Sequence, residues 1–244
     1  MDKDSLPYMS DGVGRKTTIV CISDTHTFHQ EIANGYGLPY GDVLIHSGDA
    51  TMNGSLKQMA IFISWMAAQP HKHKIFVPGN HDFCAQSDMS TIYGMCIEGR
   101  IQMLIDRGIE IGDNYFFGSP WVPNLSGWAF YATSAELERR FSAIPEQTNV
   151  LVTHGPPSGT LDVIPGARLL NHDPHGQPQD EWTDDKGLHV GSVAMLSRVV
   201  ALPRLKLHVF GHIHESYGRE GRSVNASVCD RDYKPVNKPI VAEI

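Results

Sequence analysis

The feature that most restricts the fold of this chain is a short apolar run followed by a polar cluster, an arrangement that occurs five times. The runs are rich in β-branched residues, as buried strands are. The clusters contain Asp, Asn or His, and four of them contain Gly. The pairs are 17–23 with Asp24-Thr25-His26, 42–47 with Gly48-Asp49, 74–77 with Gly79-Asn80-His81-Asp82, 149–153 with His154-Gly155, and 205–210 with Gly211-His212-Ile213-His214. Because ligands of α/β sheets bind beyond the carboxyl ends of strands, we expect the five clusters to meet at one edge.

Helical patterns separate these runs and predict an α/β fold with central, partly parallel sheets. Apolar residues recur at helical spacing over residues 55–68, 134–141 and 191–202, and more weakly over 97–106. Ser55 and Ser134 are the expected N-caps of the first two helices. Shorter strands are expected at residues 109–111, 114–118, 223–226 and 239–241.

The length of 244 residues suits one sizeable core. We therefore expect a single domain over residues 17–244, preceded by a flexible, polar lead-in over residues 1–16 that lacks the apolar core of a secretory signal. Residues 155–187 are polar, rich in Pro, Gly, Asp and His, and without periodicity, which predicts an inserted functional loop. No apolar run is long enough to span a membrane.

Charge and cysteine usage restrict the partners and the compartment. The net charge is −7 and no basic stripe is present, so binding of duplex nucleic acid is not expected. The four cysteines form no Cys-x-x-Cys pair, and Cys21 lies in an apolar run as a buried thiol would. This usage fits a reducing, cytoplasmic location. Nothing in the sequence indicates an oligomeric state.

The residue types in the five clusters indicate a particular metal chemistry. Carboxylate and imidazole groups together suit divalent ions such as Mn²⁺, Fe²⁺ and Zn²⁺. Because the clusters contain no cysteine, a structural thiolate zinc site is not expected. Two-metal sites commonly hold their ions about 3.5–4 Å apart.

In their order and spacing, the five segments resemble the motifs of the calcineurin-like metallophosphoesterases. The resemblance extends from Ser23 to His214. The segments Thr153-His154-Gly155-Pro156-Pro157, His189-Val190-Gly191 and Asn225-Ala226-Ser227 further resemble the small metallophosphoesterase-domain proteins of the 239AB type. This resemblance implies a four-layer α/β/β/α sandwich with mixed sheets, two divalent metal ions (Mn, Fe or Zn), and hydrolysis of a small phosphate ester.

The same resemblance implies a role for each residue of the clusters. One metal ion is expected on Asp24, His26, Asp49 and His214, and the other on Asp49, Asn80, His154 and His212. Asp49 would bridge the two ions, and a hydroxide between them would attack the phosphate. The expected catalytic residue is His81, which would stabilise charge or protonate the leaving oxygen. Some family members have an Asp three residues after the bridging Asp to orient this histidine, but this chain has Met52 there.

Three functions remain open at this point. The favoured one is a phosphodiesterase that acts on a small substrate, with cyclic nucleotides among the candidates. The alternatives are a phosphomonoesterase, including a protein phosphatase, and a non-catalytic scaffold that binds metal. Two residues outside the clusters also have two interpretations. His29 closely follows the first cluster, so it either lines the site or lies outside it. Trp121 either flanks a nucleobase or covers the core.

Overall fold

The computed structural model describes residues 16–123, 125–166, 168–172, 178–182 and 187–244, with side chains described outside residues 167–186. The lead-in expected over residues 1–16 lies almost wholly outside the described residues. One sheet has the strand order β15-β1-β2-β3-β4. Strands β1 to β4 run parallel, and β15 is antiparallel to β1. The strands are β1 Thr18–Ile22, β2 Val43–His46, β3 His73–Phe76, β4 Gln102–Met103 and β15 Ile240–Glu243.

The second sheet has the strand order β13-β14-β12-β7-β6-β5. Its four central strands, β14, β12, β7 and β6, are parallel, and its edge strands β13 and β5 are antiparallel to their neighbours. The strands are β5 Arg107–Ile111, β6 Asn114–Ser119, β7 Val150–Thr153, β12 Leu207–Phe210, β13 Gly218–Glu220 and β14 Ser223–Asn225. The mixed sheets expected from the sequence are therefore confirmed.

Both faces of the central strands are buried, which explains their unbroken apolar sequences. In β1, Ile19 and Cys21 pack into the core between the two sheets, whereas Val20 and Ile22 pack against helices on the outer face. Cys21 is fully buried, and burial raises the pKa of its thiol to about 12. All four cysteines are free and buried.

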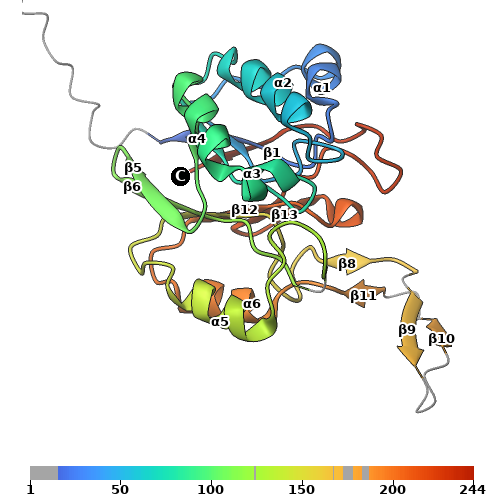
Figure 1. Ribbon diagram of the computed structural model, residues 1–244. Coiled ribbons are helices and arrows are strands. Elements are labelled where there is room, and N and C mark those ends of the chain that lie inside the picture. The colour runs from blue at the N-terminus through green and yellow to red at the C-terminus, as the bar shows by residue number, and fades with distance from the viewer. Residues whose placement is uncertain (1–15, 124, 167, 173–177, 183–186) are drawn as a thin grey trace, which may run out of the picture.

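Helices cover the outer face of each sheet and complete four layers (Figure 1). Four helices lie over the first sheet, and two lie over the second. They are α1 His29–Gly35, α2 Leu56–Ala67, α3 Phe83–Ser87 and α4 Met89–Glu98 on one side, and α5 Ser134–Ser142 and α6 Val193–Ala201 on the other. Three packed cores join the layers, so the α/β/β/α sandwich is confirmed.

Local capping decides where the helices begin. The Ser55 side chain accepts a hydrogen bond from the Gln58 backbone N–H at 3.4 Å, so the expected cap of α2 is confirmed. The expected cap Ser134 is wrong by one residue. Thr133 is the N-cap of α5 and forms a capping box with Glu136, which binds the Thr133 backbone N–H in return.

The helix expected over residues 97–106 is also wrong. Helix α4 ends at Glu98, Gly99 follows as its C-cap, and the chain then enters strand β4. Ile101 and Met103 pack into the core beside the first sheet. Apolar residues at this spacing fit an edge strand as well as a helix, and the turn at Gly99 and Arg100, where Arg100 has a φ of 54°, separates the two.

The inserted loop expected over residues 155–187 contains strands. They are β8 Val163–Ile164, β9 Arg168–His172 and β10 Pro178–Trp182, and β8 pairs with β11 Leu188–His189. The hairpin of β9 and β10 projects from the body of the molecule (Figure 1). Low periodicity in the sequence therefore did not exclude short strands here, and the role of the segment as an inserted functional loop stays a prediction. Among the described residues, no helix has the length and apolar character needed to cross a membrane.

Candidate metal centre and active site

The polar clusters meet where the carboxyl ends of parallel strands from both sheets come together. A bridge between Ser23 and Ser227 joins the ends of the two sheets at this edge. Three groups of side chains here each offer ligand atoms that lie within 4.8 Å of one another. The groups are Asp24, His26 and His214; His26, Asp49 and His81; and Asp49, His154 and His212.

The backbone at this edge adopts conformations that L-residues rarely take. Asp24, His26, Asp49 and His212 have φ values of 54°, 41°, 55° and 71°. Such strain costs of order 1–3 kcal/mol per residue and clusters at functional sites. Glycines permit the close approach, since a Cβ on Gly48 would overlap the His154 ring. The chain therefore accepts local strain to direct these side chains inward.

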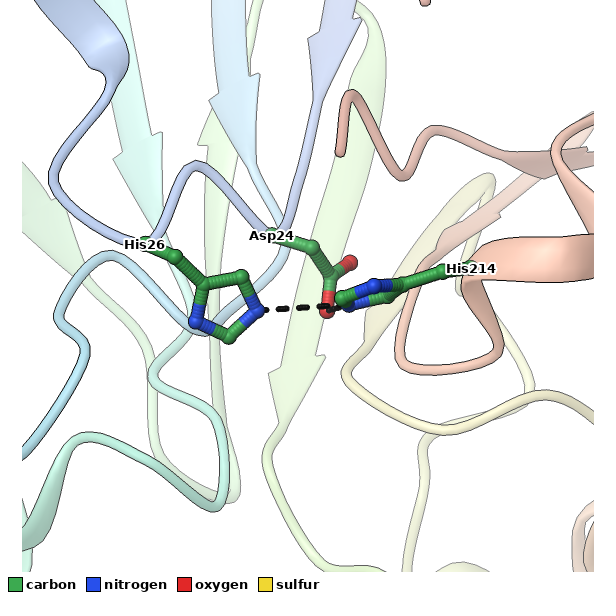
Figure 2. Close-up of side chains that lie close together, drawn as sticks. All are labelled: Asp24, His26 and His214. Atoms are coloured by element: carbon green, nitrogen blue, oxygen red, sulfur yellow. Dashed lines mark hydrogen bonds and ion pairs between the residues drawn. The ribbon is translucent and has the colours of Figure 1, made fainter. Parts of the chain in front are cut away.

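Figure 2 shows the first group, in which the side chains of Asp24, His26 and His214 point toward one another. The Nε2 atoms of His26 and His214 lie 3.2 Å apart, and His214 Nε2 lies 3.3 Å from Asp24 Oδ1. The carboxylate of Asp24 is held by the Ser227 hydroxyl, which donates to Oδ2 at 2.9 Å, and by the His212 backbone N–H.

Asp49 belongs to the third group and lies between it and the first. Its Oδ2 atom is 3.9 Å from His26 Nε2 on one side and 3.4 Å from His154 Nε2 on the other. His154 Nε2 in turn lies 2.8 Å from Asn80 Oδ1. His212 completes the third group. The structure thus brings together all seven side chains expected as metal ligands, with Asp49 in the central position. We call this set the cage: Asp24, His26, Asp49, Asn80, His154, His212 and His214.

The hydrogen bonds of the histidine rings fix the nitrogen that faces the cage. Nδ1 of His26 faces the Thr51 carbonyl at 3.2 Å, that of His154 faces the Ser47 carbonyl at 3.0 Å, and that of His214 faces the Asp230 carbonyl at 2.9 Å. Because a carbonyl only accepts, each Nδ1 carries a hydrogen, and each Nε2 atom faces the cage, where the neutral form of the ring offers its lone pair to a metal ion. Metal-binding histidines have this arrangement.

The donor set therefore fits divalent cations. The Nε2 atoms of His26 and His214 face each other at 3.2 Å beside the carboxylate of Asp24, so acceptors converge there when both rings are neutral. A proton or a cation between them removes the repulsion. Nitrogen and carboxylate ligands of this kind suit Mn²⁺, Fe²⁺ or Zn²⁺.

In the absence of metal, protons take up part of the negative charge of the cage. Burial lowers the pKa of His154, but the charge and hydrogen bond of Asp49 outweigh burial and raise that pKa to about 9. Burial is likewise outweighed at His214, where the hydrogen bond and charge of Asp24 raise the pKa to about 9. At His26 burial prevails and lowers the pKa to about 4. The cage without metal is thus a proton-binding site.

His81 lies beside the cage, as expected. Its Nε2 atom is 3.9 Å from Asp49 Oδ2, and its backbone N–H donates to Asp49 Oδ1 at 2.8 Å. Its Nδ1 donates to the Met52 carbonyl at 2.7 Å. The backbone of Met52 therefore orients the ring at the position where some family members use a carboxylate, and it adds no formal charge.

Asp82 supports the loops of the cage. Its carboxylate accepts hydrogen bonds from the backbone N–H groups of Ala50, Thr51 and Gly79 and from the Thr51 hydroxyl. It thus ties the loop after β2 to the loop after β3. Burial and the neighbouring charge of Asp49 raise the pKa of Asp82 to about 6.

A cavity of about 340 Å³ opens over the cage. Its lining residues include His81, Trp128, Glu215, Arg231 and Tyr233. This volume suits a small ligand. A larger hollow of about 570 Å³ lies between α5 and α6, but it contains none of the expected site residues.

Two residues with open interpretations lie away from the cavity. His29 is buried, and its ring contacts Phe62 and Trp65 in the helical core. Trp121 packs beside the core, donates from Nε1 to Asp106 at 2.7 Å, and is covered by the Arg140 guanidinium. Trp121 therefore takes the core role, and it does not line the cavity.

Sequence reasoning missed the residues that form the cavity wall and part of the support. Trp128, Arg231 and Tyr233 lie in segments without periodicity, so no pattern marked them. Ser227 belonged to the Asn225-Ala226-Ser227 segment noted for its resemblance, and that resemblance was the available signal.

Comparison with known proteins gives the chain a family. A profile of the family described as Calcineurin-like phosphoesterase matches residues 17–216. The chain is 34% identical to Metallophosphoesterase domain-containing protein 1 of Homo sapiens, over 99% of this chain and 75% of that protein. It is 33% identical to the UPF0046 protein K07C11.7 of Caenorhabditis elegans, over 98% of this chain and 76% of that protein.

The fold has a counterpart among solved structures. The protein TT1561 of Thermus thermophilus superposes with a TM-score of 0.56 at 12% identity, covering 94% of this chain and 99% of that chain. At that identity the likeness concerns the fold alone. With the profile match and the similar relatives, the chain belongs to the calcineurin-like phosphoesterase family, a family of metal-dependent phosphoester hydrolases.

Proposed function

We propose that this protein hydrolyses a small phosphodiester with two divalent metal ions held in the cage. The observation that carries the proposal is the convergence of inward-facing Nε2 atoms and two buried carboxylates around Asp49. We assign one ion to Asp24, His26, Asp49 and His214, and the other to Asp49, Asn80, His154 and His212. When bound, such ions activate water as a nucleophile and neutralise charge on the phosphate.

The residues of the chain have separate tasks in this reaction. The carbonyls of Thr51, Ser47 and Asp230 hold the histidines in the ligand tautomer. His81, oriented by the Met52 carbonyl, directs Nε2 toward the cage. From there it stabilises charge on the phosphate or, when Nε2 carries a proton in addition to Nδ1, donates that proton to the leaving alcohol oxygen as the P–O bond breaks.

The charges around the cavity favour a diester over a monoester. A diester carries one negative charge at neutral pH, whereas a monoester carries about two. Among the described lining residues, Arg231 is the only Lys or Arg, and Glu215 adds a carboxylate. Both side chains are exposed. The second charge of a monoester is therefore poorly matched at the mouth of the cavity.

The proposal is tested by comparing bis(4-nitrophenyl) phosphate with 4-nitrophenyl phosphate on Mn²⁺-loaded protein. We expect metal-dependent hydrolysis, with kcat/KM about tenfold higher for the diester, a difference of roughly 1.4 kcal/mol. The Glu215→Gln variant is expected to narrow this preference, and Glu220→Gln, an exposed change outside the cavity, is the matched control. A preference for the monoester would favour the phosphomonoesterase alternative, and hydrolysis that survives chelation would exclude the metal mechanism.

A further inference from the structure

Two large aromatic side chains stand exposed at the cavity over the cage. Trp128 is 41% exposed and Tyr233 is 37% exposed, and both line the cavity beside His81. Neither ring is part of a buried core cluster. Aromatic rings bury large areas when they find a partner, so their exposure at this position leaves contact surface available.

Trp128 lies against the ring expected to act in catalysis. The centroids of the Trp128 and His81 rings are 4.6 Å apart, at an interplanar angle of 49°. Phe83 supports Trp128 from 5.8 Å, with the two rings inclined by 32°. A tryptophan that served only to cover His81 and Phe83 would be largely buried. The exposed fraction of Trp128 instead leaves part of the indole open to the cavity.

Tyr233 lies on a loop that is hydrogen-bonded to a histidine of the cage. Its φ is 59°, and the loop is closed by Asp230 Oδ1, which accepts from the backbone N–H groups of Asp232 and Lys234 at 2.9 Å each. The Asp230 carbonyl also accepts from His214 Nδ1. Because one residue both shapes the loop and orients a cage histidine, the position of Tyr233 is coupled to that of the cage.

The Tyr233 ring meets the cage histidines edge to face. Its centroid lies 4.7 Å from that of His26 and 5.4 Å from that of His214, with interplanar angles of 79° and 82°. It also lies 6.1 Å from the His81 ring, which Trp128 contacts as well. Among the described aromatic pairs, Trp128 and Tyr233 do not contact each other. Each ring therefore borders the cavity separately.

We propose that Trp128 and Tyr233 are specificity-determining residues that hold a planar aromatic group of the substrate beside the cage. The inference rests on the proposed function and names its substrate class, a phosphodiester with an aromatic or heteroaromatic ring in one ester group. The cavity of about 340 Å³ suits a phosphate and one ring. Tyr233 lies beyond residue 216, where the family profile match ends, so part of this wall comes from outside that match.

The test uses two probes with the same anionic head, methyl benzylphosphonate and methyl cyclohexylmethylphosphonate. The side groups are similar in size, but only the benzyl group is planar. Binding to Zn²⁺-loaded protein is measured by calorimetry and by quenching of tryptophan fluorescence. We expect the benzyl probe to bind about 3- to 10-fold more tightly, as aromatic contacts of this kind allow.

The variants separate ring contact from bulk. We expect Trp128→Ala to reduce the ratio of the two affinities nearly to one, whereas Trp128→Phe retains most of the ratio but loses the fluorescence quenching. Tyr233→Leu is expected to lower the ratio, and Tyr233→Phe to retain it. Tyr40→Ala, at a position 83% exposed, is the control that leaves the ratio unchanged. Circular dichroism verifies that each variant folds.

The outcomes distinguish this inference from the proposed reaction. Equal affinity of the wild type for the two probes, or an undiminished affinity ratio in Trp128→Ala, overturns the role proposed for Trp128 and Tyr233. This holds even when metal-dependent diester hydrolysis is found. If the protein has no hydrolytic activity but its affinity ratio for the two probes depends on Trp128, the role proposed for the two aromatic residues is supported and the proposed reaction is overturned.

Discussion

At the residue scale, the hydrogen-bond partner of one ring nitrogen decides which nitrogen of each buried histidine is left to bind a metal ion. His26, His154 and His214 donate Nδ1–H to backbone carbonyls, so their Nε2 atoms face the cage. His208 has the opposite arrangement. The Thr153 hydroxyl donates to the Gly155 carbonyl and therefore accepts from His208 Nε2, which leaves Nδ1 of this buried ring unprotonated and without a partner among the described residues.

The first prediction concerns His81. We expect His81→Asn to lower kcat for diester hydrolysis by about 10²- to 10⁴-fold, because it removes the positioned proton donor. The metal content should not change, since the contact with Asp49 Oδ1 comes from the backbone N–H. Steady-state kinetics and elemental analysis check the two effects, with the exposed His189→Asn as control. Wild-type turnover in His81→Asn would favour a different proton donor.

The second prediction concerns proton release. His154 and His214 have pKa values of about 9 in the protein without metal, because the nearby carboxylates outweigh burial. Both rings are therefore protonated at pH 7 and must lose a proton to act as ligands. We expect metal loading at pH 7 to release about two protons per chain and to strengthen as the pH rises toward 9. Calorimetry in buffers of different ionisation enthalpy measures this release, and a heat independent of buffer would contradict it.

At the element scale, the ends of the strands carry the site and the loops complete it. The strands were predictable because burial on both faces leaves apolar runs, as in β1 and β2, that end in polar clusters. The expected helix over 97–106 failed because the apolar spacing of Ile97, Ile101 and Ile105 suits a helix, while the turn at Gly99 breaks it. Trp128 and Tyr233 were not predictable, since tertiary structure alone brings their loops together.

The third prediction concerns the contact between β7 and β12. Burial, and then the charge of Arg222, lower the pKa of His208 to about 3. Below pH 6.5 the unfolded state binds a proton that the folded state does not, so this contribution to stability is lost as the pH falls toward 3. When the pH is lowered from 7 to 5, we expect the unfolding free energy of the wild type to fall by about 2 kcal/mol more than that of His208→Gln.

Urea unfolding of the protein without metal at several pH values checks this difference. The comparison concerns the dependence on pH, because the substitution also changes the absolute stability. Parallel pH profiles for the wild type and His208→Gln would show that the buried imidazole is not the titrating group.

At the scale of the whole molecule, the cage joins two sheets that otherwise meet through an apolar core. Asp24 and Asp49 follow strands of the first sheet, while His154 and His212 follow strands of the second. The clusters could be assigned to one edge from the sequence because parallel strands share the direction of their carboxyl ends. Their distances could not, because they depend on how the two sheets pack.

The fourth prediction follows from this junction. Ions that bind only the folded protein stabilise it by about 2.7 kcal/mol per site at 100 times Kd. For a domain of this size, we expect Tm to rise by at least roughly 5 °C under that condition. Scanning calorimetry with and without chelator measures the shift. Asp49→Asn should reduce it by weakening both sites, and an undiminished shift would place the stabilising ions elsewhere.

The most direct test of the two-metal cage is an anomalous difference map from crystals of the Zn²⁺-loaded protein. We predict two peaks about 3.5–4 Å apart on either side of the Asp49 carboxylate. One peak should lie among Asp24, His26 and His214, and the other among Asn80, His154 and His212. A single peak, or two peaks that do not share Asp49, would contradict the bridging role assigned to this residue.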